Sequence, residues 1–313
     1  MDFNLTVLGS ASAMPVTGRY QSAQVLRVHG RSFLIDCGEG VQRRLLRFHV
    51  PMMGIESVFL SHIHGDHVFG LPSLLSTLGM MGRTKPLNLY APANFGPLLK
   101  FFLSYYGEGI GYEIRHVPLT MKEPAVVYSA RSMEILAFPL NHKIETFGFL
   151  FREKMPQMNV RKEKIGEYAL TLAEIGCIKR GEDVVRARPD GGNTVIPFAE
   201  VGYQPYIPRS YAYCSDTAPF PELPDWVRGV DLLYHETTYL AEMADQAVQR
   251  HHSTTLDAAR CARDAGARRL VIGHYSSRNR ETARYEAECR TFFPETFAAD
   301  DGSVFDVPLV RPE

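Results

Sequence analysis

The stretch SVFLSHIHGDH, residues 57–67, contains an apolar strand that leads directly into a cluster of potential metal ligands. Neutral imidazole and carboxylate groups are good ligands for zinc and similar divalent ions. The four candidates, which fall within six residues, are His62, His64, Asp66 and His67. The glycine between them lets the backbone turn, so that successive side chains can converge on one point. A polar loop of solvated histidines is the alternative, and this density of ligands argues against it.

Four neighbouring ligands cannot complete the coordination of two metal ions, so a dinuclear site needs partners from elsewhere in the chain. Three candidates share a position, because each follows the end of an apolar stretch that is typical of a strand. They are His142 after residues 135–140, Asp216 after residues 211–214, and His274 after residues 270–273. Any one of them alone could be an ordinary core or surface residue. Their common position predicts seven ligands and two metals at one edge of a sheet.

The apolar pattern predicts strands and helices in both halves of the chain, without strict alternation. The expected strands are residues 5–8, 24–28, 32–36, 57–60, 87–90, 133–140, 211–213, 232–234 and 269–272. The expected helices are residues 41–48, 71–81, 96–105 and 255–265. Two packed sheets with helices on the outside, an α/β fold of the αββα sandwich type, fit this mixture. We therefore expect one hydrolase domain over residues 1–313.

Residues 152–209 differ in composition from the rest of the chain, which predicts an arm-like insertion that protrudes from this domain. From residue 152 to residue 188 there are nine Lys or Arg against six Asp or Glu, with few β-branched residues until the end. The stretch from residue 193 to residue 209 contains three prolines. An excess of three positive charges supports modest phosphate binding. A solvated surface hairpin with no role in RNA binding is the alternative.

Composition places limits on the class of protein. With 313 residues, 45% hydrophobic and 22% charged, the chain can form a sizeable core, and its net charge of −1 argues against bulk nucleic-acid binding. The five cysteines are scattered and form no C-x-x-C pair, which fits a reducing compartment. We see no signal peptide and no apolar run long enough to span a bilayer. We therefore expect a cytoplasmic protein with no membrane association.

Longer motifs add a resemblance to these observations. SHIHGDHVFG is similar to the H-x-H-x-D-H signature of metallo-β-lactamase-fold hydrolases. The wider pattern resembles the ribonuclease Z family, in the short bacterial form of these tRNA 3′-processing endonucleases. The matching blocks, in order, are LGSASAMP, FLIDCGEG, YCSDT, HETT at residues 235–238, HHSTT at residues 251–255 and VIGH. The resemblance covers the whole chain except the insertion, and the pairing of HETT with H-x-S-T is its most specific part.

The resemblance implies a role for each site residue. One metal would be bound by His62, His64 and His142, the other by Asp66, His67 and His274, with Asp216 as a bridge. Two zinc ions per chain are implied, and other divalent metals such as manganese are possible. Asp66 would also accept the proton of the attacking water. His252 would protonate the leaving 3′-oxygen and Glu236 would orient His252, although His252 could instead be a helix cap. The other histidines are expected to be structural: His29, His49, His116, His235 and His251.

The implied reaction is cleavage of precursor tRNA after the discriminator nucleotide, which leaves a 3′-hydroxyl on the tRNA and a 5′-phosphate on the trailer. The insertion would be the arm that grips tRNA in this family, although the Gly/Pro-rich motif of common bacterial arms is not evident here. A homodimer is also implied, and residues 74–81 could form its interface or simply belong to the core.

Three other functions compete with this one. A phosphodiesterase for a small substrate such as a cyclic nucleotide would need no arm. A non-catalytic binding protein would tolerate the loss of metal ligands, and the candidate ligands are intact. A β-lactamase proper is disfavoured because we see no secretion signal.

Overall fold

The structure is a computed structural model that describes residues 1–279 and 281–312. Its chain divides into two compact units. The first, here called the sandwich unit, comprises residues 1–129, 134–152 and 210–307. The second, here called the small unit, comprises residues 130–133, residues 153–209 and the C-terminal residues from Pro308. No helix in the described part of the chain is long and apolar enough to cross a membrane.

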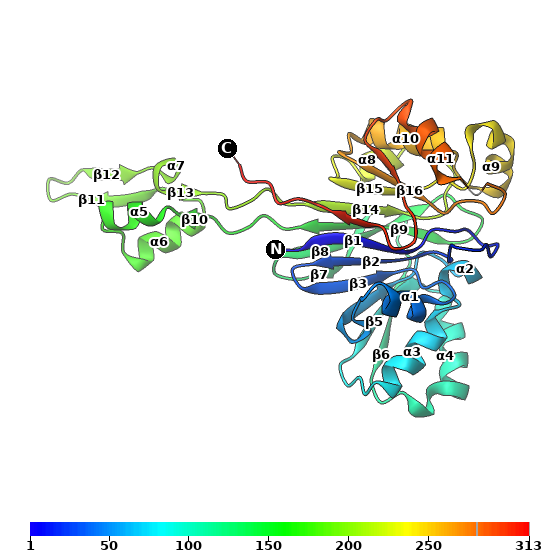
Figure 1. Ribbon diagram of the computed structural model, residues 1–313. Helices are drawn as coiled ribbons and strands as arrows, with labels where there is room; N and C mark the ends of the chain where they lie inside the picture. The colour runs from blue at the N-terminus through cyan, green and yellow to red at the C-terminus, as the bar shows by residue number, and fades with distance from the viewer. Residues whose placement is uncertain (280, 313) are drawn as a thin grey trace. The chain divides into compact units, whose positions relative to one another are not determined.

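Two seven-stranded sheets form the sandwich unit (Figure 1). The first has the order β18-β1-β2-β3-β4-β5-β6 and the second the order β17-β16-β15-β14-β9-β8-β7. The strands of the first sheet are β1 (Phe3–Gly9), β2 (Ala23–Val28), β3 (Arg31–Ile35), β4 (Ile55–Phe59), β5 (Leu87–Pro92), β6 (Ile114–Leu119) and β18 (Val304–Asp306). Those of the second are β7 (Ala125–Ser129), β8 (Met133–Leu140), β9 (Thr146–Glu153), β14 (Ser210–Cys214), β15 (Leu232–Glu236), β16 (Leu270–Gly273) and β17 (Thr296–Ala298).

Helices cover the outer face of each sheet, so the predicted αββα sandwich is confirmed (Figure 1). The first sheet packs against α1 (Val41–Arg47), α3 (Leu71–Met80) and α4 (Phe95–Tyr106). The second packs against α8 (Leu223–Trp226), α10 (Thr255–Ala265) and α11 (Thr282–Arg290). The remaining helical segments of this unit are α2 (Gly65–Val68), α9 (Ala244–Arg250), η1 (Met52–Gly54), η2 (Gly107–Gly109) and η3 (Ala241–Met243).

The sequence of α10 shows why it forms and where it ends. Thr254 caps its first turn in a capping box with Asp257, and Gly266 ends it in the left-handed conformation. Its buried face consists mostly of alanines and Cys261, which allows the helix to pack closely on the second sheet. The predicted helix at residues 255–265 has the same bounds.

Aromatic side chains fill the space between the two sheets. Phe33 and Phe59 of the first sheet contact Phe149 and Phe151 of the second, with ring centroids 5.2 to 5.7 Å apart between the sheets. All four are fully buried. Such edge-on and tilted ring contacts stabilise more than burial alone, so they help to hold the two sheets together.

The small unit has its own elements and its own core. Its strands form two pairs, β10 (Asn159–Val160) with β13 (Gly202–Tyr203) and β11 (Val184–Ala187) with β12 (Asn193–Ile196). Its helices are α5 (Lys162–Glu167), α6 (Leu172–Lys179) and α7 (Phe198–Val201). Five buried residues form the core: Leu170, Ile178, Val184, Ile196 and Val201. The predicted insertion at residues 152–209 overlaps this unit almost completely.

The predicted strands and helices all lie within a few residues of their observed bounds. The expected strand at residues 32–36 ends at Ile35, because Asp36 has a φ of 54° and leaves the sheet. Strands β6, β7 and β9 and helix α11 were not predicted. Strand β9 is buried at seven of its eight positions, so it lacks the alternation that identifies a half-buried strand.

Candidate metal centre

The seven predicted ligands converge on one edge of the sandwich unit. The run after β4 contributes His62 and His64 from a loop, and Asp66 and His67 from α2. The other three lie just past β8, β14 and β16, as the strand-end pattern predicted: His142, Asp216 and His274. Their ligand atoms form clusters that could each hold a metal ion. The structure thus brings together residues that are up to 212 positions apart in the sequence.

The first cluster consists of His62, His64, His142 and one oxygen of Asp216. His64 Nδ1 lies 3.0 Å from His62 Nε2 and 3.4 Å from His142 Nε2. Asp216 Oδ2 lies 3.6 Å from His62 Nε2 and 3.9 Å from His142 Nε2. A tetrahedral zinc shell with bonds of about 2.1 Å has edges of about 3.4 Å. These four atoms therefore have the spacing of one such shell.

The second cluster consists of Asp66, His67, His274 and the other oxygen of Asp216. His67 Nε2, His274 Nε2 and Asp66 Oδ2 are each 3.4 Å apart. Asp216 Oδ1 lies 3.5 Å from His67 Nε2 and 3.2 Å from His274 Nε2. Among the described residues, this oxygen is buried without a hydrogen-bond donor. A buried carboxylate oxygen without a donor fits a bound cation, and the two oxygens of Asp216 face different clusters.

Hydrogen bonds on the far side of the imidazoles fix which nitrogen faces each cluster. In four histidines Nδ1 has an acceptor outside the cluster, so the Nε2 lone pair points inward. The pairs are His62 with Ser61 Oγ at 2.9 Å, His67 with Asp36 Oδ2 at 2.7 Å, His142 with the carbonyl of His251 at 2.8 Å, and His274 with Thr238 Oγ1 at 2.8 Å. Inward lone pairs that face carboxylates repel them unless a cation lies between. The donor set therefore fits divalent metal ions.

Electrostatics agree with this donor set. Burial, together with neighbouring histidines, holds the pKa of His62 well below its usual value, which favours the neutral imidazole that binds metal. Burial also lowers the pKa of His64 and of His142. Burial opposes ionisation of Asp66, but His67 and His274 outweigh it and hold the pKa of that carboxyl far below its usual range.

Asp36 is the main residue of this region that the sequence did not single out. Its Oδ2 accepts hydrogen bonds from His67 Nδ1 at 2.7 Å, Ser61 Oγ at 2.8 Å and Tyr213 OH at 2.6 Å. It is fully buried and adopts a left-handed φ of 54°, which is uncommon outside glycine. The available signal was a carboxylate directly after a buried strand, the same position that marked the ligands. Thr238 was also missed as the partner of His274.

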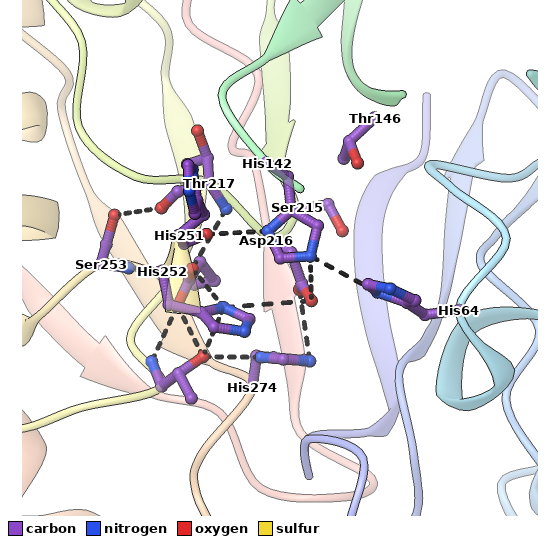
Figure 2. Close-up of polar contacts among 12 residues, drawn as sticks. His64, His142, Thr146, Ser215, Asp216, Thr217, His251, His252, Ser253 and His274 are labelled. Carbon is purple, nitrogen blue, oxygen red and sulfur yellow. Dashed lines mark hydrogen bonds and ion pairs between the residues drawn. The ribbon is translucent and has the colours of Figure 1, made fainter. Parts of the chain in front are cut away.

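His252 lies beside the clusters but is held by another carboxylate (Figure 2). Its Nδ1 is 2.9 Å from Glu236 Oε1 and 4.0 Å from Asp216 Oδ2. Burial disfavours the charged imidazole, but Glu236 and Asp216 outweigh it and raise the pKa of His252 to about 9. Burial likewise favours neutral Glu236, and His252 outweighs it to lower the pKa of Glu236 to about 2. The cap of α10 is Thr254, so His252 is not a helix cap.

A cavity of about 570 Å³ opens onto these groups. His64, Asp66, His142, Asp216, His252 and His274 all line it. Three basic side chains also line it: Lys143, Arg250 and Arg278. Within the described residues, neither Lys143 nor Arg250 forms an ion pair, whereas Arg278 donates to Gln246. A substrate in this cavity would contact both the candidate metal-binding atoms and unpaired positive charges.

The histidines expected to be structural lie outside this cavity. His235 is buried, and its Nδ1 donates to the carbonyl of Glu236. His116 Nε2 lies 3.4 Å from the carbonyl of Ala91. His251 differs from the others, because its backbone carbonyl binds His142 although its side chain is exposed.

Comparisons with known proteins cover almost the whole chain. It is 38% identical over 301 residues to ribonuclease Z of Parabacteroides distasonis, which covers 96% of this chain and 98% of that protein. It is 39% identical over 307 residues to ribonuclease Z of Cytophaga hutchinsonii, which covers 98% and 97%. The fold is similar to that of human tRNase Z, short form, with a TM-score of 0.70, 24% identity, and coverage of 97% and 99%. The family model of the anti-Pycsar protein Apyc1 matches residues 3–116.

Proposed function

The chain belongs to the ribonuclease Z family of metal-dependent nucleases, and on this basis we propose that it removes 3′ trailers from tRNA precursors. It would cut after the discriminator nucleotide, leaving a 3′-hydroxyl on the tRNA and a 5′-phosphate on the trailer. The observation that carries the proposal is one cavity lined by residues of two ligand clusters that share Asp216, together with His252, which Glu236 holds outside both clusters. That combination suits phosphodiester hydrolysis with a poor leaving group.

We propose two divalent ions per chain, with zinc as the preferred metal. His62, His64 and His142 would hold one ion, Asp66, His67 and His274 the other, and Asp216 would contribute one oxygen to each. The ions, when bound, would supply Lewis-acid activation of the scissile phosphate and of water. Asp66 lines the cavity and would hold the proton of the attacking water in the orientation needed for in-line displacement.

His252 would protonate the leaving 3′-oxygen. With a pKa of about 9 it is charged at neutral pH, and its Nδ1 proton is committed to Glu236. The proton on Nε2 is therefore the one available to substrate. Although His252 also lies within reach of Asp216 and His274, the nitrogen nearest to Asp216 is the one already bound to Glu236. This geometry favours an acid over an eighth metal ligand.

The proposed RNA contacts lie in both units. In the cavity, Lys143 and Arg250 are free to bind the phosphates that flank the cleavage site. In the small unit, Arg161, Lys162 and Lys179 are exposed and form no ion pair within the described residues. By contrast, Lys164, Arg180 and Arg186 are paired with neighbouring carboxylates. We propose that the small unit acts as the arm-like insertion and that these three cations bind phosphates of the tRNA.

We also propose a homodimer that works in the cytoplasm, where precursor tRNA is found. Phe69, Leu98, Phe101 and Tyr106 line an apolar groove beside α3 and α4, and all four side chains are exposed. Aromatic groups exposed together on one face are typical of interfaces, and a second copy would present the same face. Sedimentation of Phe101→Glu tests this: a shift from dimer to monomer supports the interface, and an unchanged dimer contradicts it.

The decisive experiment is incubation of the purified protein with a labelled precursor tRNA, with and without a chelator. We expect a single cut after the discriminator nucleotide, abolished by the chelator. The second candidate function, a small-substrate phosphodiesterase, would need no arm-like insertion, so the small unit at residues 153–209 argues against it. Rapid hydrolysis of a cyclic nucleotide without precursor cleavage would support it instead.

A further inference from the structure

The hydroxyl of Thr238 lies between the proposed acid pair and one metal ligand. Thr238 Oγ1 is 2.7 Å from Glu236 Oε2, 2.8 Å from His274 Nδ1 and 3.3 Å from His252 Nδ1. The residue is almost fully buried, at 4% exposure. A threonine hydroxyl has one proton to donate and lone pairs to accept, so its contacts have a defined polarity.

Glu236 determines which group donates and which accepts in these hydrogen bonds. Its carboxylate receives five hydrogen bonds, from the backbone N–H groups of Thr217, Thr238 and Ser253, from Thr238 Oγ1 and from His252 Nδ1. A buried carboxylate surrounded only by donors must act as an acceptor. The single hydroxyl proton of Thr238 therefore points to Glu236. Thr238 can then only accept from His274, which places the proton of His274 on Nδ1.

This tautomer decides whether His274 can bind metal. With the proton on Nδ1, His274 Nε2 offers a lone pair toward Asp66 Oδ2, Asp216 Oδ1 and His67 Nε2, at 3.4, 3.2 and 3.4 Å. With the proton on Nε2 instead, the ring would present an N–H to the cluster and could not be a ligand. Glu236, the carboxylate that holds His252, therefore also determines through the Thr238 hydroxyl that His274 Nε2 presents a lone pair to the cluster.

We propose that Thr238 is a positioning residue: it donates to Glu236 and accepts from His274 Nδ1, which leaves His274 Nε2 free to bind metal. One buried carboxylate thus orients both the leaving-group acid and a ligand of one metal cluster. This inference rests on the proposed two-metal function. It assigns to Glu236 a second task besides orienting His252. It also explains why HETT lies across the end of β15: the parallel register pairs Glu236 with Gly273, which brings Thr238 beside the residue that follows β16.

The test measures metal binding directly rather than activity. Metal-free protein is titrated with zinc in competition with a chromophoric chelator, for the wild type, Thr238→Val, Thr238→Ser and Thr237→Val. Valine keeps the shape of threonine but can neither donate nor accept. Thr237 is a matched control, because it is also buried but its hydroxyl donates to the carbonyl of Gly273 and, among the described residues, forms no hydrogen bond with a side chain of the site.

We expect Thr238→Val to bind one zinc like the wild type and the second about 10- to 100-fold more weakly, the usual effect of removing the partner of a ligand. Thr238→Ser should restore the second site and Thr237→Val should match the wild type. Two wild-type affinities in Thr238→Val, equal weakening of both sites, or no rescue by serine would each overturn the proposal. A wild-type protein that binds fewer than two ions would instead refute the two-metal function itself.

Discussion

Replacing His252 separates the proposed acid from the metal clusters. The side chain is mostly buried, and its one short contact with a charged group is the 2.9 Å bond to Glu236. In His252→Ala, Glu236 would keep four of its five hydrogen bonds. Both clusters should therefore survive, although the buried carboxylate loses its cation. His252→Asn is the matched variant, because an amide N–H can replace the Nδ1 donor while no acid remains.

The expected kinetic loss follows from the role of the imidazole. A positioned general acid contributes roughly 10²- to 10⁴-fold, or about 3 to 5 kcal/mol of barrier. We expect both variants to lose this factor in the single-turnover rate on precursor tRNA. On bis-p-nitrophenyl phosphate the loss should be much smaller, because p-nitrophenolate leaves without a proton. His252→Asn should be the better folded of the two, since it keeps a partner for Glu236.

The assay combines single-turnover rates on both substrates with metal content and melting temperature for each variant. If either variant loses an ion, His252 is a ligand. If both substrates slow equally, His252 acts on water or phosphate rather than on the leaving oxygen. If His252→Asn cleaves precursor tRNA at the wild-type rate, the only task of His252 is to support Glu236. Each of these results would refute the assignment of the acid.

Three further perturbations test other parts of the site. Dialysis against a chelator should abolish cleavage and zinc should restore it, with two ions per chain by elemental analysis; one ion at saturation contradicts the shared role of Asp216. Val160 and Gly202 are paired neighbours in β10 and β13, so joining them through an Asn-Gly turn removes most of the small unit. This deletion should raise KM for precursor tRNA and spare bis-p-nitrophenyl phosphate, whereas equal loss would make the unit structural. Lys143→Ala and Arg250→Ala should each weaken precursor binding and reduce its salt dependence by about one ion, and an unchanged salt slope would exclude phosphate contact.

The sequence indicated where the candidate ligands lie because their signal is local. His142, Asp216 and His274 each follow an apolar run, and the end of a strand at a sheet edge can be recognised without knowing its partners. The clustered run after β4 needed no tertiary information at all. How the seven side chains would divide between the two proposed metal ions was available only through the resemblance, because the division depends on which strands are neighbours.

Residues that act through another side chain could not be found in this way. Asp36 binds His67 across 31 positions and Thr238 binds His274 across 36. Both contacts depend on strand order and register, which periodicity does not specify. Asp36 was instead assigned to a strand, since a single carboxylate after three apolar residues resembles an ordinary strand end. The buried strand β9 was missed for a related reason, because continuous burial removes the period of two.

Backbone conformation connects these two kinds of residue. Asp36 and His274 directly follow β3 and β16, and both adopt a left-handed φ, 54° and 61°, without being glycine. Such a conformation costs on the order of 1 kcal/mol or more, and it turns the side chain sharply out of the strand direction. Glycine would relieve the strain and remove the carboxylate or the imidazole. The strained backbone therefore occurs at the two positions where an extended backbone would direct the side chain away from the clusters. The hydrogen bonds between Asp36 and His67 and between Thr238 and His274 hold the turned side chains in place.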